Sequence, residues 1–268
     1  MPETDTAGIA AAAEDFDLLK NAAREAGVIA MGYFGKSPEV WMKGGTSPVS
    51  EADYAADTYL RETLLAARPD YGWLSEETAD DPARLSARRT FVVDPIDGTR
   101  GFLEGRSTWC VSVAVVEAGR SLAGVLECPA RQETYWAMRG QGAFRNGRPI
   151  RTGELGEILN IAGPKALLDR LPQAWQGRMN RVPHIPSLAY RLAMIADGSL
   201  DATFVKPNAH DWDIAAAELI LTEAGGHLFD SRRRTPSYAG EITELGALVA
   251  GSTALVDELI DVLADAQS

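Results

Sequence analysis

Asp94 and Asp97 lie three residues apart in the segment 91–99, which reads FVVDPIDGT. A run of strand formers leads into this segment, and its proline and glycine favour a turn. Both carboxylates can therefore face one point, and oxygen ligands of this kind suit a hard divalent cation. Gly98 and Thr99 add backbone N–H groups and a hydroxyl where a helix could begin, which suits a phosphate group. A metal site beside a phosphate site is typical of a metal-assisted phosphatase.

Two further acidic segments stand at expected element boundaries. Glu76 and Glu77 follow a short strand-like run at 71–74, and Asp213 stands just before a predicted helix. Taken alone, the glutamate pair is typical of a solvated loop, and Asp213 is typical of a helix N-cap. If the three segments converge, they supply the oxygen ligands that Mg²⁺ requires, and two metals can hold both the attacking water and the leaving oxygen.

Composition and charge limit the class of protein. Of the 268 residues, 46% are apolar and 24% are charged, the balance of an ordinary soluble globular protein. The formal charge of −12 argues against nucleic acid as the main partner, because phosphate contacts need clustered Lys and Arg. A small phosphorylated substrate stays compatible with this charge, since bound cations reverse the local field.

Cysteine usage and apolar stretches indicate a cytoplasmic protein that acts without a membrane. Cys110 and Cys128 have no metal-binding spacing and form no disulfide framework, which favours a reducing compartment. The apolar stretch 9–13 is short and follows no basic segment, so we expect no signal peptide. No window approaches the roughly 18 apolar residues of a membrane span.

The elements that must position the acidic segments are a mixture of helices and strands. Apolar periodicity predicts helices at residues 15–34, 51–67, 190–196, 214–224 and 252–264. Runs of strand formers predict strands at residues 71–74, 90–93, 109–116, 122–128, 133–137, 158–162, 200–205 and 247–250. The third of these strands has little polarity, so we expect it to be buried on both faces. Residues 36–50 read as a loop or irregular hairpin, and composition changes near 151–157.

The segment 94–99 (DPIDGT) resembles the signature of the inositol monophosphatase superfamily of Mg²⁺-dependent phosphatases. Three further stretches match in the family's order: 47–53 (SPVSEAD), 74–77 (LSEE), and 212–217 (WDIAAA) with 223–226 (EAGG). The resemblance implies an α/β fold, a layered αβαβα sandwich. Its N-terminal part would cover residues 1–153, with an antiparallel sheet, and its C-terminal part residues 154–268. The active site would lie at their junction.

The resemblance also implies which residues hold metal. The first Mg²⁺ would bind Glu76, Asp94 and the carbonyl of Ile96. The second would bind Asp94, Asp97 and Asp213. Glu76 would also share a third, weaker ion through water, which gives it a catalytic role. Inhibition by Li⁺ and a homodimer follow from the same resemblance.

The attacking water and the phosphate have their own expected partners. By resemblance, Asp53 and Thr99 orient and deprotonate the water, and the N–H groups of Gly98 and Thr99 take the phosphate at a helix N-terminus. Arg100 adds a cation beside that phosphate. Lys43 resembles the lysine of a Gly-rich loop that reaches toward the site. The products would be a free alcohol and inorganic phosphate.

Substrate choice depends on residues outside these motifs. Inositol-specific members carry an acidic residue seven positions before the last metal ligand, where this chain has Lys206. A lysine there favours a second anionic group, and Arg191 could face the same group. Both could equally be solvated surface charges. These residues favour a 3′(2′),5′-bisphosphate nucleotidase that releases AMP from adenosine 3′,5′-bisphosphate, with inositol-1-monophosphatase and histidinol-phosphatase as alternatives.

Other function classes fit less well. Haloacid-dehalogenase phosphatases need a nucleophilic Asp two residues before the acid/base Asp, whereas the spacing here is three and Pro95 occupies that place. A non-catalytic metal- or phosphate-sensing protein would not need the water-activating pair. The twelve-residue ligand spacing of a calcium-binding EF-hand is absent from the sequence.

Overall fold

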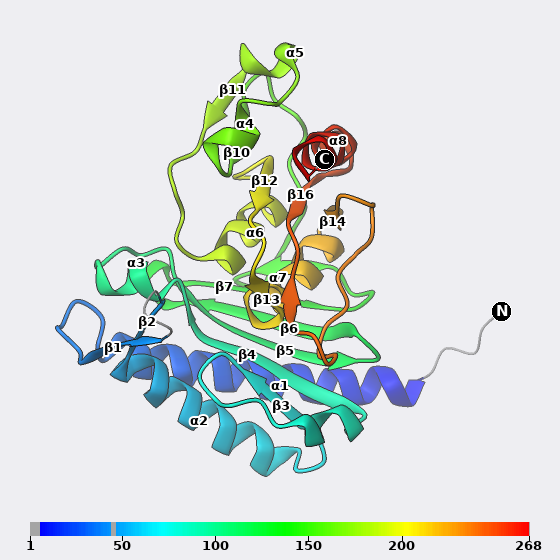
Figure 1. The fold of residues 1–268 in the computed structure, drawn as a ribbon. Helices are drawn as coiled ribbons and strands as arrows, with labels where there is room; N and C mark the ends of the chain where they lie inside the picture. The colour runs from blue at the N-terminus through cyan, green and yellow to red at the C-terminus, as the bar shows by residue number, and fades with distance from the viewer. Residues whose placement is uncertain (1–5, 44–46, 268) are drawn as a thin grey trace.

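The chain folds into alternating layers of helices and sheets (Figure 1). The structure, a computed structural model, describes residues 6–43 and 47–267, so Gly44, Gly45 and Thr46 of the expected loop lie outside the described residues. The largest sheet has seven strands, in spatial order β3 (Gly72–Ser75), β4 (Arg89–Asp97), β5 (Cys110–Glu117), β6 (Arg120–Cys128), β7 (Glu133–Met138), β8 (Ala143–Arg145) and β9 (Arg148–Ile150).

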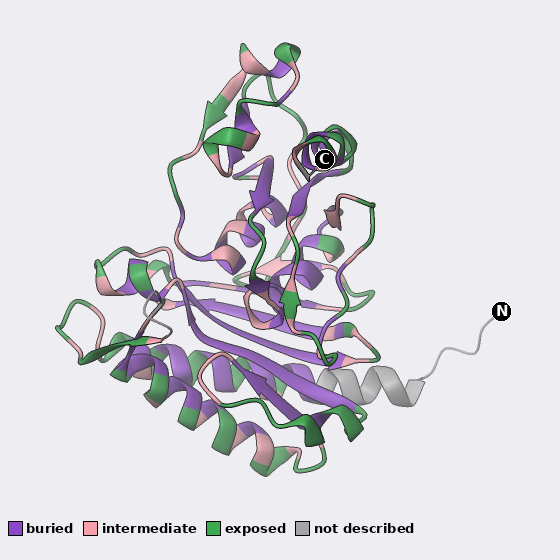
Figure 2. Ribbon diagram, in the orientation of Figure 1, coloured by how far each residue is buried: buried purple, intermediate pink, exposed green. Residues whose placement is uncertain are grey.

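Helices cover both faces of this sheet. On one face, α1 (Thr6–Met31) and α2 (Glu51–Ala67) pack together against β4, β5 and β6. On the other face, α7 (Asp211–Glu223) packs on β5 and β6 beside α6 (Leu188–Ala196). Alternate residues of β5 therefore join different cores, with Val113 facing α1 and α2, and Ala114 facing α7. The prediction that this strand is buried on both faces is confirmed (Figure 2).

A second, smaller sheet lies beyond α6 and α7. Its strands, in spatial order, are β11 (Met179–Arg181), β10 (Leu159–Ala162), β12 (Ala202–Val205), β16 (Leu248–Ser252) and β14 (Gly226–Asp230). The last helix, α8 (Thr253–Gln267), packs on its outer side together with the short α4 (Lys165–Leu168). The layers therefore run helix, sheet, helix, sheet, helix, which confirms the predicted αβαβα sandwich.

Short elements complete the chain. They are the hairpin of β1 (Val40–Lys43) and β2 (Ser47–Ser50), α3 (Thr99–Leu103), α5 (Gln173–Gln176), the pair β13 (Ala209–His210) and β15 (Glu244–Leu245), and 3₁₀ turns at Pro82–Ser86 and Pro129–Arg131. No helix among the described residues is both long and apolar enough to cross a bilayer. The division at residue 153 stays a prediction.

Two expectations about the elements need correction, and one strand was not predicted. The strand expected at 90–93 continues to Asp97, because a register shift between Asp94 and Asp97 lets the chain keep pairing with β5. The large sheet is not wholly antiparallel, since β3 pairs with β4 in parallel. The sequence reading also missed β14, which directly follows the α7 C-terminus and Gly225.

Candidate active site

The two carboxylates of the central motif lie in the irregular end of β4. Asp94 pairs with Ser112 and Asp97 with Cys110, so β4 carries one residue more than β5 over this stretch. The extra residue bends the strand and re-aims its side chains. The Ile96 backbone N–H donates to Asp94 Oδ1 over 3.0 Å, which fixes that carboxylate within the irregular stretch.

Asp213 completes an acidic cluster from the other half of the chain. One carboxylate oxygen from each of Asp94, Asp97 and Asp213 lies within 4.8 Å of the others. Asp213 is the third residue of α7 and accepts the His210 backbone N–H over 2.6 Å, so it closes a capping box rather than serving as the N-cap. Burial and the charges of Glu76, Asp97 and Asp213 raise the pKa of Asp94 well above its usual value.

The N-terminus of α6 holds Asp97 in place. Ser187 Oγ donates to Asp97 Oδ2 over 2.5 Å, the Ala189 N–H donates to the same oxygen over 2.6 Å, and the Leu188 N–H reaches Oδ1 over 3.3 Å. Burial raises the pKa of Asp97 to about 6, and these hydrogen bonds oppose the rise. Sequence reasoning gave no role to Ser187, which also caps α6 by accepting the Tyr190 N–H.

Gly98 must be a glycine at this junction. Its φ is +93°, in the left-handed region, and a Cβ there would lie 3.0 Å from the Ser187 backbone nitrogen. The chain can therefore pass close to α6 and start α3 at Thr99.

The expected water-activating pair is in direct contact. Thr99 Oγ1 lies 3.0 Å from Asp53 Oδ1 and 3.0 Å from the Ile96 carbonyl oxygen. The Ser50 N–H and hydroxyl both donate to Asp53 Oδ2, which closes the capping box of α2. Burial raises the pKa of Asp53 to about 6, against the effect of these donors.

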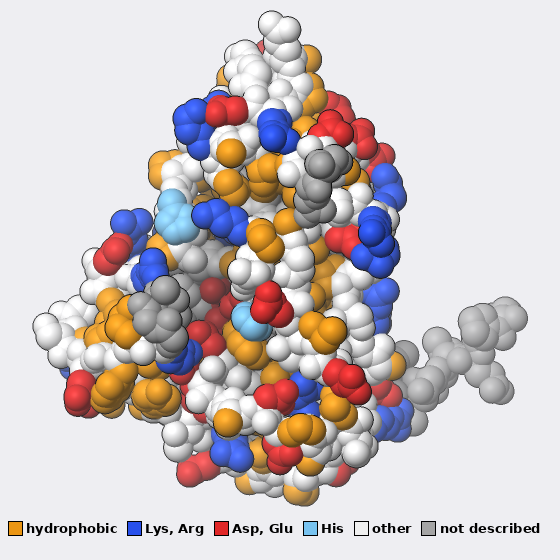
Figure 3. Space-filling view, in the orientation of Figure 1, with side chains coloured by type: hydrophobic (Ala, Val, Ile, Leu, Met, Phe, Trp, Pro, Cys, Tyr) orange, Lys and Arg blue, Asp and Glu red, His pale blue; other side chains and the backbone are white. Residues whose placement is uncertain are grey.

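A cavity of about 340 Å³ lies at the acidic cluster and Thr99. Its lining is Pro48, Glu76, Asp94, Asp97, Gly98, Thr99, Arg100, Glu104, Arg106, His184, Pro186 and Asp213. Figure 3 shows acidic side chains inside a hollow whose rim carries Lys, Arg and His side chains. Lys43 lies beside it and forms ion pairs with Glu76 and Glu77.

A second cavity of about 410 Å³ adjoins the first and shares Asp97, Asp213, His184 and Pro186 with it. Arg191 and Lys206 line this second cavity, as do apolar residues such as Phe204. The sequence reading missed His184; its place between two prolines, in VPHIP, was the available signal. Burial lowers the pKa of His184, and the charges of Arg191, Arg106 and Lys206 lower it further.

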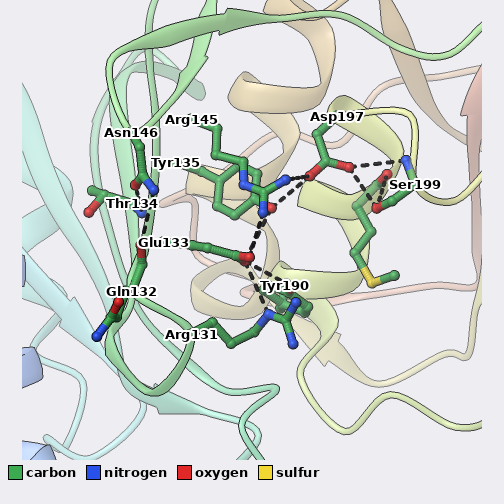
Figure 4. A network of polar contacts seen from close by, with 11 residues as sticks. Arg131, Gln132, Glu133, Thr134, Tyr135, Arg145, Asn146, Tyr190, Asp197 and Ser199 are labelled. Atoms are coloured by element: carbon green, nitrogen blue, oxygen red, sulfur yellow. Dashed lines mark hydrogen bonds and ion pairs between the residues drawn. The ribbon is translucent and has the colours of Figure 1, made fainter.

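A polar network anchors α6, the helix that carries Ser187 and Arg191 (Figure 4). Glu133 of β7 accepts hydrogen bonds from Tyr190 over 2.9 Å and from Arg145 over 2.5 Å. Arg145 and Tyr135 both donate to Asp197 at the other end of α6. The helix is thus tied to the large sheet at two points, which fixes its N-terminus against Asp97.

The donor set fits a hard divalent cation. The ligand atoms that Asp94, Asp97 and Asp213 offer are all carboxylate oxygens, and Glu76 lines the same cavity. The structure brings together Glu76, Asp94, Asp97 and Asp213 in the lining of one cavity, and it places Asp53 in contact with Thr99. The Ile96 carbonyl oxygen lies within hydrogen-bond distance of Thr99 Oγ1, and Arg191 and Lys206 line the adjoining cavity.

Comparison with known proteins gives the chain its relatives. An inositol-1-monophosphatase of Rhizobium meliloti is 33% identical over 84% of this chain and 86% of that protein. A histidinol-phosphatase of Chlorobaculum parvum is 32% identical over 92% and 95%. The 3′(2′),5′-bisphosphate nucleotidase CysQ of Aggregatibacter actinomycetemcomitans is 30% identical over 81% and 84%.

The fold of the chain is also similar to that of solved structures. The extragenic suppressor protein suhB of Bartonella henselae superposes with a TM-score of 0.80 at 28% identity, covering 92% of this chain and 97% of that one. The model of the inositol monophosphatase family matches residues 12–265. The chain therefore belongs to the inositol monophosphatase family, a family of phosphoric monoester hydrolases.

Proposed function

We propose that this phosphatase removes one phosphate from a small metabolite that carries a second anionic group, with a 3′(2′),5′-bisphosphate nucleotide as the substrate. The observation that carries the proposal is the position of Arg191 and Lys206. Both line the cavity that shares Asp97 and Asp213 with the acidic site. A substrate with one phosphate at the acidic cluster could reach these cations with its other phosphate.

Arg191 supports a second anion-binding position more strongly than Lys206 does. Its Nε is buried and has no hydrogen-bond partner among the described residues. A buried donor without a partner costs about 1–3 kcal/mol, and more when it is charged. A phosphate oxygen would satisfy that donor with a charge-assisted hydrogen bond. The apolar lining around Phe204 suits a flat base more than a polyol.

The chemistry would take place at the acidic cluster. Glu76, Asp94, Asp97, Asp213 and the Ile96 carbonyl would hold two Mg²⁺ ions, with a third near Glu76. When bound, Mg²⁺ supplies positive charge that balances the phosphoryl oxygens and eases deprotonation of water. We also propose that Li⁺ inhibits the enzyme, that the protein forms a homodimer and that it is located in the cytoplasm.

The chain's own residues would prepare the attack. Thr99 Oγ1, held by Asp53 Oδ1 at 3.0 Å, would orient the water and pass its proton to Asp53. Asp53 is suited to this role, because a pKa of about 6 leaves it ionised at neutral pH but still basic enough to accept a proton. The N–H groups of Gly98 and Thr99, with Arg100, would orient the phosphate. Attack in line with the leaving oxygen gives the alcohol and inorganic phosphate.

A substrate panel tests the proposal. Phosphate release would be measured with Mg²⁺ for adenosine 3′,5′-bisphosphate, inositol 1-phosphate and histidinol phosphate. We expect the bisphosphate to have the highest kcat/KM. Much faster hydrolysis of either monophosphate would overturn the substrate assignment and favour the corresponding alternative activity.

Lys206→Met adds a test of the second-anion contact. Loss of one phosphate contact should raise KM for the bisphosphate about tenfold, with little effect on the monophosphates. Lys165→Met is the matched control, since Lys165 is 80% exposed and lies on the outer α4. Equal effects of Lys206→Met on both substrate types would contradict the proposal.

A further inference from the structure

Lys43 makes an ion triad at the edge of the acidic site. Its Nζ lies 3.0 Å from Glu76 Oε1 and 2.7 Å from Glu77 Oε1. Glu76 lines the cavity, and its side chain is 20% exposed. The ammonium therefore pairs with the very carboxylate that the proposed function assigns to a metal ion.

Glu77 differs from Glu76 in its surroundings. Its side chain is 1% exposed, and its Oε2 is buried without a hydrogen-bond partner among the described residues. A buried carboxylate needs a counter-charge, and Lys43 supplies it. Glu77 is not part of the cavity lining, so it has no route to the phosphate there.

Hydrogen bonds to α2 hold the segment 75–78, which carries both glutamates. Asp57 of α2 accepts Ser75 Oγ over 2.5 Å and Thr78 Oγ1 over 2.6 Å, and the Glu77 N–H donates to Ser75 Oγ. Because both ends of the segment 75–78 are fixed on α2, Glu77 keeps a set position. It can therefore hold Lys43 beside Glu76.

We propose that Lys43 is the counter-ion of Glu76 in the metal-free protein and that Glu77 holds Lys43 there. A divalent cation must displace Lys43 from Glu76 in order to bind. The inference rests on the proposed metal site. Glu77 is then a positioning residue, because it acts through Lys43. After displacement, Glu77 retains the ammonium close to the cavity, so its positive charge is not lost from the site.

Mg²⁺ binding without substrate tests this competition, measured by isothermal titration calorimetry on the chelator-treated full chain. Lys43→Met removes the competitor and should lower the Mg²⁺ dissociation constant about twofold to fivefold, which corresponds to the loss of a partly exposed ion pair. Lys43→Arg keeps a cation and should stay within about twofold of wild type. Lys36→Met, a neighbouring exposed lysine, controls for general loss of surface charge.

Glu77→Gln separates positioning from simple charge loss. Without the Glu77 carboxylate, Lys43 is no longer held beside Glu76 and competes less, so Mg²⁺ binding should tighten in the single variant. In the Lys43→Met background the same change should have little effect on the dissociation constant. Equal effects of Glu77→Gln in both backgrounds would overturn its role as a positioning residue.

The remaining outcomes are distinct. If Lys43→Met binds Mg²⁺ as wild type does, or more weakly, the counter-ion role of Lys43 is wrong while the metal site stands. If neither wild type nor any variant binds Mg²⁺, the proposed metal site fails and the inference fails with it. Thermal unfolding of each chelated variant, with an unfolding midpoint near that of wild type, verifies that the variants are folded.

Discussion

Replacing Asp94 with Asn is expected to stabilise the metal-free protein while removing its metal-dependent activity. Oxygens of Asp94, Asp97 and Asp213 lie within 4.8 Å of one another. Two unit charges at that separation repel by about 3.5 kcal/mol at an effective dielectric constant of ~20. Asp94 has two such neighbours, so full ionisation of the cluster would cost up to about 7 kcal/mol through this residue.

Proton uptake relieves much of this repulsion, because the pKa values of all three carboxyls are raised. We therefore expect Asp94→Asn to raise the free energy of unfolding by about 2 kcal/mol, the equivalent of one to two pKa units. For a chain of this size that corresponds to a rise in Tm of roughly 4 °C. Asn keeps the Oδ1 acceptor for the Ile96 N–H, so the local backbone should hold.

The assay is thermal unfolding in EDTA at pH 5 and pH 8, with Asp17→Asn as an exposed control. A carboxyl with a raised pKa binds its proton more tightly when folded, so wild-type stability rises as pH falls through that pKa. The advantage of Asp94→Asn is therefore largest at pH 8 and shrinks toward pH 5. Mg²⁺ should raise the Tm of wild type far more than that of the variant. A variant less stable than wild type in EDTA at pH 8 would refute the reasoning.

Three further predictions concern the residues around the cluster. If Asp53 is the base that we propose, it must be ionised to accept a proton, so the acid limb of the kcat/KM profile should fall with an apparent pKa of about 6. Asp53→Asn should then lower activity at least about 10²-fold, and a profile that is flat down to pH 5 would contradict this role. Thr99→Ala should lower kcat about 10²-fold, whereas Thr99→Ser should keep most of the activity, because serine retains the hydroxyl in contact with Asp53. Equal losses of kcat in steady-state assays would indicate that Thr99 acts only through its packing. Ser187→Ala removes both the hydrogen bond to Asp97 and the cap of α6, so it should lower the free energy of unfolding in urea by about 1–2 kcal/mol. An unchanged unfolding midpoint would show that neither hydrogen bond stabilises the fold.

Local sequence patterns indicated which residues of the segment 94–99 would lie together. Asp94, Asp97 and Gly98 lie within five residues, so their spacing and turn chemistry are legible without knowledge of the rest of the fold. The resemblance to a family added partners from farther away, and Asp53 does contact Thr99 across 46 residues of sequence. The helix Glu51–Ala67 was predicted with its observed bounds.

Contacts made only by folding were not predictable in this way. Ser187 meets Asp97 across 90 residues, and no periodicity in the sequence indicates that contact. His184 depends on where an extended segment between β11 and α6 runs, which sequence spacing does not determine. Glu77 reads as a solvated charge until the burial of its side chain is known.

The most direct test of a metal-dependent site at the acidic cluster is phosphate release from adenosine 3′,5′-bisphosphate by one preparation, measured with Mg²⁺, after chelation and after Mg²⁺ is restored. The account predicts release with Mg²⁺, background release after chelation, recovery on restoration, and background release from Asp213→Asn throughout. Release that persists without divalent cations, or that Asp213→Asn leaves undiminished, would contradict it.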